Sequence, residues 1–169
     1  MHTAKHIVRN SAENLSQVTL ELGGKSPQIV FSDANLDKAL PFLVNAGIQN
    51  SGQTCSASSR ILVHKPILYE VLERMAKSYK ALKVGPALDD YDLGPVISQK
   101  QKDIISNYED KGTNIELVAQ GSLTESAEMT GFYKNAKLFH TSNYKHILAQ
   151  EEIFGPIQIV IPFEDEAEA

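Results

Sequence analysis

Apolar residues occur along this chain in two alternating arrangements. Short continuous apolar runs at 27–31, 59–64, 115–119, 136–139 and 158–163 are bounded by turn residues, which is typical of buried strands. Between them, apolar positions recur every three or four residues, as around Leu36, Leu40 and Leu43 and around Leu68, Val71 and Met75, which predicts amphipathic helices. Regular alternation of strands and helices predicts an α/β fold built on a parallel sheet.

The N-terminal part of the chain predicts a helix followed by a strand. Residues 1–17 carry apolar side chains at helical spacing, whereas 18–22 is β-rich and stops at Gly23 and Gly24. Glu21 is therefore expected near the end of a strand that turns sharply. By itself, Glu21 is read as a solvated acid on an edge strand.

Individual residues predict where the helices begin, bend and end. Pro41 lies inside an apolar helical stripe, where the missing N–H is expected to kink the helix or to restart it. Ser98 and Gln101 have the S-x-x-Q form of a capping box, and Gly112 is expected to stop that helix. The acidic tail at 164–169 predicts the first turn of another helix.

Composition excludes several classes of function. The chain has 16 Lys and Arg against 21 Asp and Glu, a formal net charge of −5, and no basic run. This balance argues against a nucleic-acid or an anionic-membrane surface. No stretch approaches the roughly 20 apolar residues of a membrane span, and no targeting signal is recognisable.

The single cysteine is the main chemical candidate. Cys55 lies among the small polar residues Asn50 to Ser56, which leave room around a nucleophilic thiolate. The alternative is a buried cysteine that packs as a small hydrophobe. One cysteine excludes an internal disulfide and suits a reducing compartment, so a cytoplasmic location is expected. The three acids at 89–92 predict a solvated turn rather than a metal site.

Three motifs extend this hypothesis. The sequences LELGGKSP at 20–27, GQTCSASSR at 52–60 and EEIFGP at 151–156 follow one another in order. With these motifs, the chain resembles the aldehyde dehydrogenase superfamily, whose members oxidise aldehydes to carboxylic acids with NAD or NADP through a cysteine thioester. The likeness covers essentially the whole chain.

The resemblance implies a role for each motif residue. Cys55 corresponds to the nucleophile and Glu21 to the general base. Glu152 corresponds to the residue that binds the nicotinamide ribose, and Phe154 to the one that packs near the nicotinamide. The same resemblance implies that Leu22 and Gly23 contact the cofactor.

Gln101 has two readings. Capping of its own helix is favoured, and the resemblance adds contact with the cofactor ribose, which a residue near this position makes in some relatives.

The resemblance also implies an incomplete domain organisation. Members of the family are nearly three times as long, so residues 1–17 are expected to be the C-terminal remnant of the cofactor-binding domain. Residues 18–169 are expected to form part of the Rossmann-like, parallel-sheet catalytic domain. We expect a small aldehyde as substrate, little or no activity in this chain alone, and either homo-oligomers or association with a missing N-terminal half.

Two other classes of function stay open from the sequence. One is a non-catalytic remnant or association module, whose uncovered sheet edges and helix faces pair with another subunit. The other is a cofactor-independent thiol hydrolase that cleaves activated esters. None of the five histidines lies in a recognisable Cys/His motif, so that reading relies on Glu21 as the base.

Overall fold

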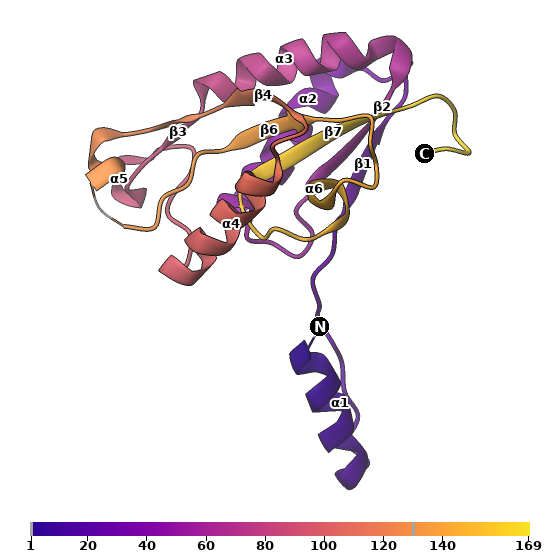
Figure 1. Ribbon diagram of the computed structural model, residues 1–169, viewed down its shortest axis with the longest axis vertical. Coiled ribbons are helices and arrows are strands. Elements are labelled where there is room, and N and C mark those ends of the chain that lie inside the picture. The colour runs from indigo at the N-terminus through magenta and orange to yellow at the C-terminus, as the bar shows by residue number, and fades with distance from the viewer. Residues whose placement is uncertain (1, 130) are drawn as a thin grey trace.

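The computed structural model describes residues 2–129 and 131–169 and places a five-stranded sheet at the centre of the molecule (Figure 1). The strand order is β1-β2-β7-β6-β4. The sheet strands are β1 Pro27–Val30, β2 Arg60–His64, β4 Glu116–Gln120, β6 Lys137–His140 and β7 Ile157–Phe163. A separate two-stranded sheet pairs β3 Lys83–Val84 with β5 Ser122–Leu123.

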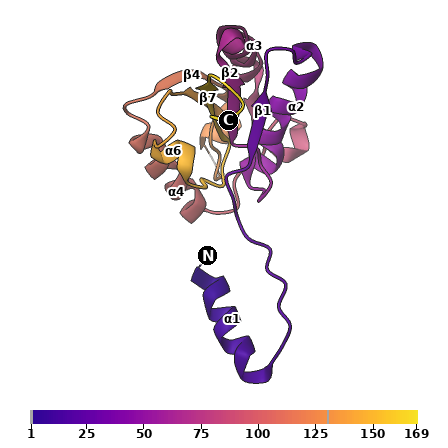
Figure 2. The same ribbon diagram turned by 90° about the vertical axis from the view of Figure 1, so that its right-hand side faces the viewer.

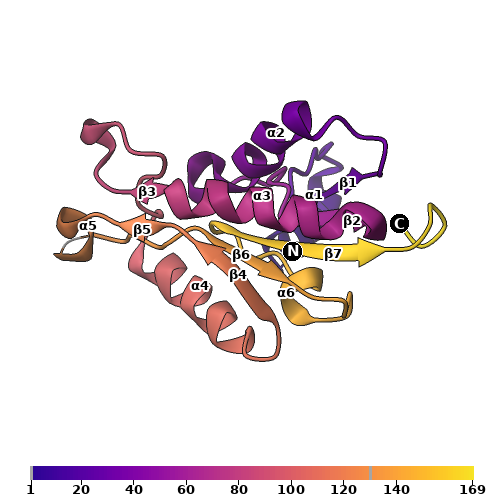
Figure 3. The same cartoon turned by 90° about the horizontal axis from the view of Figure 1, so that it is seen from above.

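Four of the five strands confirm the predicted parallel sheet. β1, β2, β7 and β6 run parallel to their neighbours, and β7, the last strand of the chain, is inserted in the middle. β4 departs from the expectation because it pairs antiparallel with β6. Between these two strands, the described residues 121–129 and 131–136 include no helix that crosses the sheet. The chain instead passes through β5 and α5 Glu125–Met129 beyond the end of the sheet and returns in the opposite direction (Figure 3).

Helices cover both faces of the sheet (Figure 3). α2 Leu36–Ile48 and α3 Leu68–Ala81 pack against one face, and α4 Gln99–Lys111 with α6 Ile147–Gln150 covers the other. The side chains of β7 alternate between the two layers. Ile157, Ile159 and Ile161 join the α4 and α6 core, whereas Val160 joins the α2 and α3 core.

Pro41 does not interrupt its helix, so the predicted restart is wrong, whereas the predicted kink stays a prediction. α2 runs unbroken from Leu36 to Ile48, with Asn35 as its N-cap accepting a hydrogen bond from the Lys38 N–H. Pro41 occupies the second turn, where its missing N–H deprives only the Asp37 carbonyl of a partner. Asp37 is exposed, so water can satisfy that carbonyl.

A polar cluster lies inside the α2 and α3 core. The Tyr79 hydroxyl donates to Gln158 Oε1 at 2.6 Å. Gln158 Nε2 in turn donates to the carbonyls of Leu43 and Ser58 at 2.9 and 2.6 Å. Burial raises the pKa of Tyr79 well above its usual range, so the phenol stays a donor. Gln158 therefore ties α2, α3 and the segment after Cys55 to the central strand.

The N-terminal helix stands apart from this body (Figures 1 and 2). α1 spans His2–Asn14, which agrees with the predicted helix, and Met1 lies outside the described residues. Residues 16–26 belong to no strand and are exposed over 16–24, so the strand predicted over 18–22 is wrong. A β-rich segment becomes a strand only when a neighbour supplies hydrogen bonds, and this one leads away from the sheet.

The remaining segments are short. The 3₁₀ turns are η1 Gln49–Gly52, η2 Lys65–Ile67 and η3 Ala87–Asp89. The acidic tail forms a turn in which the Ala169 N–H donates to the Asp165 carbonyl at 3.2 Å. Within 2–129 and 131–169, every helix is too short or too polar to cross a membrane.

Candidate active site

The three sequence motifs meet in the folded chain. The Gly24 N–H donates to Glu152 Oε1 at 3.1 Å, joining residues that lie 128 positions apart. Gly23 approaches the same carboxylate so closely that an added Cβ would lie 1.8 Å from Glu152 Oε2. The cysteine motif contacts the other side of this loop, because a Cβ on Gly52 would lie 2.1 Å from the Gly155 carbonyl oxygen. Glycine at 23 and 52 therefore permits the three motifs to pack together.

The turn that leads to Cys55 has an unusual backbone. Asn50, Ser51 and Gly52 all have left-handed conformations, with φ of 51°, 55° and 73°. Non-glycine residues adopt this region only at a cost, so such a run needs support from its surroundings.

Side chains supply that support. Asn50 Nδ2 donates to the Gln53 carbonyl, and Gln53 Nε2 donates to the Asn50 carbonyl, each at 3.1 Å. Ser51 Oγ donates to the Gly94 carbonyl at 2.9 Å. The turn is thus fixed internally and also anchored to a segment more than forty residues further along the chain.

Cys55 follows this turn on the surface. Its side chain is exposed, so the alternative of a buried, purely structural cysteine is wrong. The residue lies in a turn rather than at the N-terminus of a helix. The arrangement presents a reachable thiol on a fixed backbone, as covalent catalysis requires.

The EEIFGP loop carries a second strained residue. Phe154 has φ of 57° and a partly exposed side chain. Gln101 Nε2 donates to the carbonyls of Ile153 and Phe154 at 3.0 and 2.9 Å. The backbone N–H of Gln101 bonds Ser98 Oγ at 3.2 Å, which confirms Ser98 as the cap of α4. The Gln101 side chain is directed to the loop and does not complete the predicted capping box.

Glu21 and Leu22 lie on the exposed connection to α1. Among the residues the structure describes, neither the Glu21 carboxylate nor the Cys55 thiol makes a hydrogen bond or ion pair. Leu22 instead lines an apolar groove of about 380 Å³ with Leu20 and the α1 residues Ala4 and Val8. The structure therefore brings Gly23 and Glu152 together beside the cysteine turn, and within 2–129 and 131–169 it gives the Glu21 carboxylate no hydrogen-bond or ion-pair partner.

Lys25 is a charged residue that sequence reasoning missed. Its Nζ is completely shielded from solvent and has no hydrogen-bond partner in the described part of the chain. Burial, with a smaller contribution from Arg60, lowers the pKa of Lys25 to about 8, while Glu152 opposes this shift. A lysine directly after two glycines gives no local signal of burial, because the shielding comes from distant segments.

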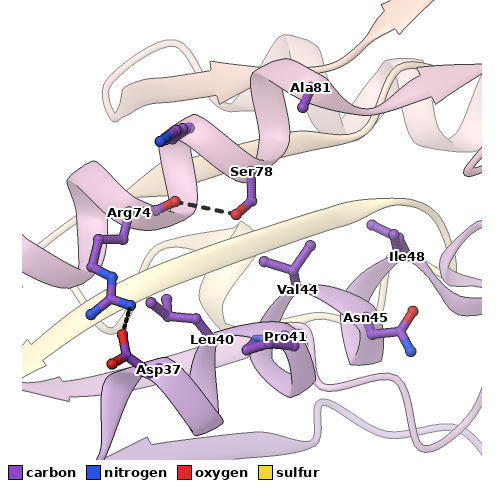
Figure 4. Close-up of a pocket in the computed structure, with 10 residues that line it drawn as sticks. Asp37, Leu40, Pro41, Val44, Asn45, Ile48, Arg74, Ser78 and Ala81 are labelled. Atoms are coloured by element: carbon purple, nitrogen blue, oxygen red, sulfur yellow. Dashed lines mark hydrogen bonds and ion pairs between the residues drawn. The ribbon is translucent and has the colours of Figure 1, made fainter.

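The space between the motifs is small. A hollow lined by Gly24, Gly52, Glu152 and Phe154 has a volume of only about 10 Å³, which is too small for a substrate. A larger groove of about 770 Å³ lies between α2 and α3 (Figure 4). Its lining, with the Asp37–Arg74 ion pair at one end, includes none of the predicted site residues.

Comparison with known proteins agrees with the fold. The sequence profile of the aldehyde dehydrogenase family matches residues 1–169. A betaine aldehyde dehydrogenase of Rhizobium leguminosarum bv. trifolii is 37% identical over 98% of this chain and 35% of its own length. The chain belongs to the aldehyde dehydrogenase family.

Solved structures give the same result. A Burkholderia cenocepacia protein assigned as an aldehyde dehydrogenase matches with a TM-score of 0.96 and 44% identity, over 99% of this chain and 36% of that protein. The NAD+ complex of an aldehyde dehydrogenase from Bacillus cereus matches with a TM-score of 0.90 and 34% identity, over 98% and 34%. The chain spans about a third of the length of these relatives.

Proposed function

We propose that this chain supplies two parts of the active site of an NAD- or NADP-dependent aldehyde dehydrogenase. These are the nucleophile Cys55 and Glu152, the carboxylate that binds the nicotinamide ribose. The observation that carries the proposal is the hydrogen bond from the Gly24 N–H to Glu152, beside the turn that presents Cys55. This bond joins the glutamate motif to the EEIFGP motif, and the contact of Gly52 with Gly155 joins the cysteine motif to the same loop. The product is a carboxylic acid, and the substrate class is a small aldehyde.

Cys55 performs the first chemical step. Its thiolate attacks the aldehyde carbon and forms a tetrahedral adduct whose oxygen bears a negative charge. Backbone N–H groups near the nucleophile stabilise such a charge when they are fixed in advance. The left-handed backbone at 50–52 and its hydrogen bonds provide that rigidity.

The residues around Glu152 fit a nicotinamide nucleotide. Glu152 is exposed, and one carboxylate oxygen is oriented by Gly24, so the carboxylate can accept hydrogen bonds from ribose hydroxyls. Gly23 keeps the side of this carboxylate free of a Cβ. Phe154 offers a partly exposed aromatic face next to it. When bound, the nicotinamide supplies the hydride acceptor.

Glu21 completes the cycle in this proposal. Once the acyl group is attached to the Cys55 sulfur as a thioester, the Glu21 carboxylate takes a proton from water, and the resulting hydroxide displaces the thiolate. In this proposal, further protein orders the exposed segment 16–24 so that Glu21 faces the thioester.

Further protein is part of the proposal for a second reason. The groove beside Leu20 and Leu22 exposes apolar side chains that a partner would cover, either the cofactor-binding part or a second subunit. We propose that residues 1–17 belong to that cofactor-binding part and 18–169 to the catalytic part. An exposed free thiol at Cys55 also suits a reducing compartment such as the cytoplasm.

A segment exchange tests the function. The chain replaces the matching segment of the Rhizobium betaine aldehyde dehydrogenase, and NADH formation from betaine aldehyde is followed by absorbance. We expect a chimera that forms NADH, a loss of at least about a thousandfold in Cys55→Ala, and a smaller loss in Glu152→Gln. A chimera that unfolds cooperatively but is as inactive as its Cys55→Ala variant contradicts the proposal.

The same assay on the 169-residue chain tests the need for further protein. We expect no NADH above the Cys55→Ala control. Cys55-dependent NADH formation by the chain alone would show that these residues suffice.

A further inference from the structure

We infer that the first turn of α4 and the segment before it form a bracket that holds the cysteine turn and the EEIFGP loop in fixed register, with Gln101 as its positioning residue. The bracket is defined as residues 94–101. This inference deepens the proposed function, because it names the residues that set the nucleophile and the cofactor-side acid relative to each other.

One side of the bracket holds the cysteine turn. The Gly94 carbonyl accepts from Ser51 Oγ at 2.9 Å, and the Ile97 N–H donates to Gln53 Oε1 at 2.8 Å. Gln53 also donates to the Asn50 carbonyl, so its carboxamide joins the bracket to the left-handed run itself. Gln53 and Ser51 lie two and four positions before Cys55.

The other side holds the loop of Glu152 and Phe154. The Gln101 carboxamide donates to two successive carbonyls, those of Ile153 and Phe154. Phe154 is the residue of this loop with a left-handed backbone, so its orientation depends on outside support. α4 also packs directly on the loop, since a Cβ on Gly155 would lie 2.5 Å from Ile105 Cδ1.

The two held segments also contact each other. Gly52 lies against the Gly155 carbonyl, so the cysteine turn, the loop and the bracket form a closed triangle of contacts. Because each of the three segments contacts the other two, losing the contacts between one pair also makes the third segment more mobile. Removing the two hydrogen bonds that Gln101 donates is therefore expected to make the EEIFGP loop more mobile. The same change is expected to make the turn at Cys55 more mobile, although Gln101 does not bond Cys55.

Gln101 uses different atoms for its two roles, the backbone N–H for capping and the side-chain Nε2 for positioning. Its part in capping α4 uses the backbone N–H bonded to Ser98 Oγ, which any substitution except proline retains. Its proposed positioning role uses only Nε2. Gln101→Met keeps the length of the side chain, removes both donors and leaves the cap in place.

The test is hydrogen exchange, followed by mass spectrometry, on the 169-residue chain and its Gln101→Met variant. We expect exchange of the peptide covering 151–157 to rise roughly fivefold to tenfold, because each lost hydrogen bond changes a local equilibrium by a factor of about two to ten. Exchange within α4 and within β2 is expected to stay the same. The matched control is Gln99→Met, which loses a surface bond to Asp103 Oδ1 on the same helix and is expected to leave 151–157 unchanged.

The second readout is the alkylation of Cys55 by iodoacetamide at fixed pH. In Gln101→Met we expect the rate to move at least threefold toward that of the chain unfolded in denaturant, with no such change in Gln99→Met. A variant that melts within a few degrees of the parent, with unaltered exchange at 151–157, overturns the bracket. So does loosening confined to α4, which would mean that the side chain serves the helix alone.

Neither readout uses aldehyde or cofactor, so the bracket and the proposed function fail separately. An inactive chimera with the expected exchange pattern would retain the bracket without the function. If the chimera is active but Gln101→Met leaves hydrogen exchange at 151–157 unchanged, the proposed function stands and the bracket does not.

Discussion

The cysteine turn and the connection that carries Glu21 hold the two residues proposed above to act in catalysis, and the two segments differ in how firmly this chain holds them. The turn at 50–53 is held by side-chain hydrogen bonds within itself and to Gly94 and Ile97. The connection is exposed over 16–24, and Leu15, the residue before it, is 90% exposed. This chain therefore fixes the turn before Cys55 with its own contacts, whereas the segment that carries Glu21 has few such contacts.

The largest effect is expected from a substitution in the cysteine turn. Gly52→Ala places a Cβ at φ of 73° and 2.1 Å from the Gly155 carbonyl oxygen, where backbone must move. We expect a loss of about 2–5 kcal/mol in the free energy of unfolding, roughly 1–2 from the positive φ and roughly 1–3 from the overpacking. Urea unfolding measures it.

Gly94→Ala is the matched control for this substitution. Gly94 belongs to the same assembly, but an added Cβ there meets nothing within 4 Å. We expect its free energy of unfolding to stay within about 0.5 kcal/mol of the parent. Equal losses in the two variants would mean that the Gly52 contact does not hold the turn.

A smaller effect is expected at Lys25, where the connection joins the body. The folded-state pKa of about 8 lies below the usual 10.5, so between these pH values the unfolded chain binds more protons than the folded chain. Stability is therefore expected to rise as the pH increases from about 8 to 10.5. The rise is at most about 3.5 kcal/mol, since one pKa unit corresponds to about 1.4 kcal/mol.

Lys25→Met tests this directly. The variant is expected to lose the rise above pH 8 and to be more stable than the parent at pH 7, by urea unfolding across pH 7–10.5. Lys38→Met, at an exposed lysine on α2, is the control and should keep the parent's pH dependence. If Lys25→Met and Lys38→Met behave alike, the Lys25 ammonium is hydrated in solution.

The sequence predicted the elements that depend on local pattern. The helices of the body and the buried runs of the sheet follow from spacing of apolar residues, because burial of one face fixes that spacing. The direction of each strand and its pairing partner were harder to predict from the sequence. The segment 18–22 has strand-forming residues but no neighbour, and β4 reverses because β5 and α5 lie off the sheet.

The motifs supplied candidate site residues, whose roles stay predictions, but they did not show how those residues are connected in the fold. The motifs named Cys55, Glu152 and Phe154, whereas the bond between Gly24 and Glu152 spans 128 residues and has no local signal. Gln101 shows the same limit. Its position matched a capping box, yet the side chain bonds a loop more than fifty residues away, and only the fold brings them together.

The smallest effect is expected from the same kind of substitution, glycine to alanine, in the segment that carries Glu21. It tests whether that segment is held less firmly than the cysteine turn. Gly23→Ala creates a closer nominal clash than Gly52→Ala, 1.8 Å against 2.1 Å, but the atom that it meets is Glu152 Oε2 at the end of an exposed, flexible side chain. The carboxylate can rotate away at the cost of its bond to the Gly24 N–H. We expect a loss of under about 1 kcal/mol in the free energy of unfolding, the usual net value of one such bond.

The local consequence of Gly23→Ala is expected to be larger than the global one. Without the carboxylate, the Gly24 amide should shift in a ¹H–¹⁵N spectrum and exchange faster, while amides of β1 and β2 stay unchanged. Gly24→Ala is the matched control, since its Cβ would meet only the Cys55 carbonyl oxygen at an ordinary 3.8 Å. A loss in Gly23→Ala as large as that in Gly52→Ala would show that the glutamate motif is as firmly built into this chain as the cysteine turn, and that the contrast between the two sides does not hold.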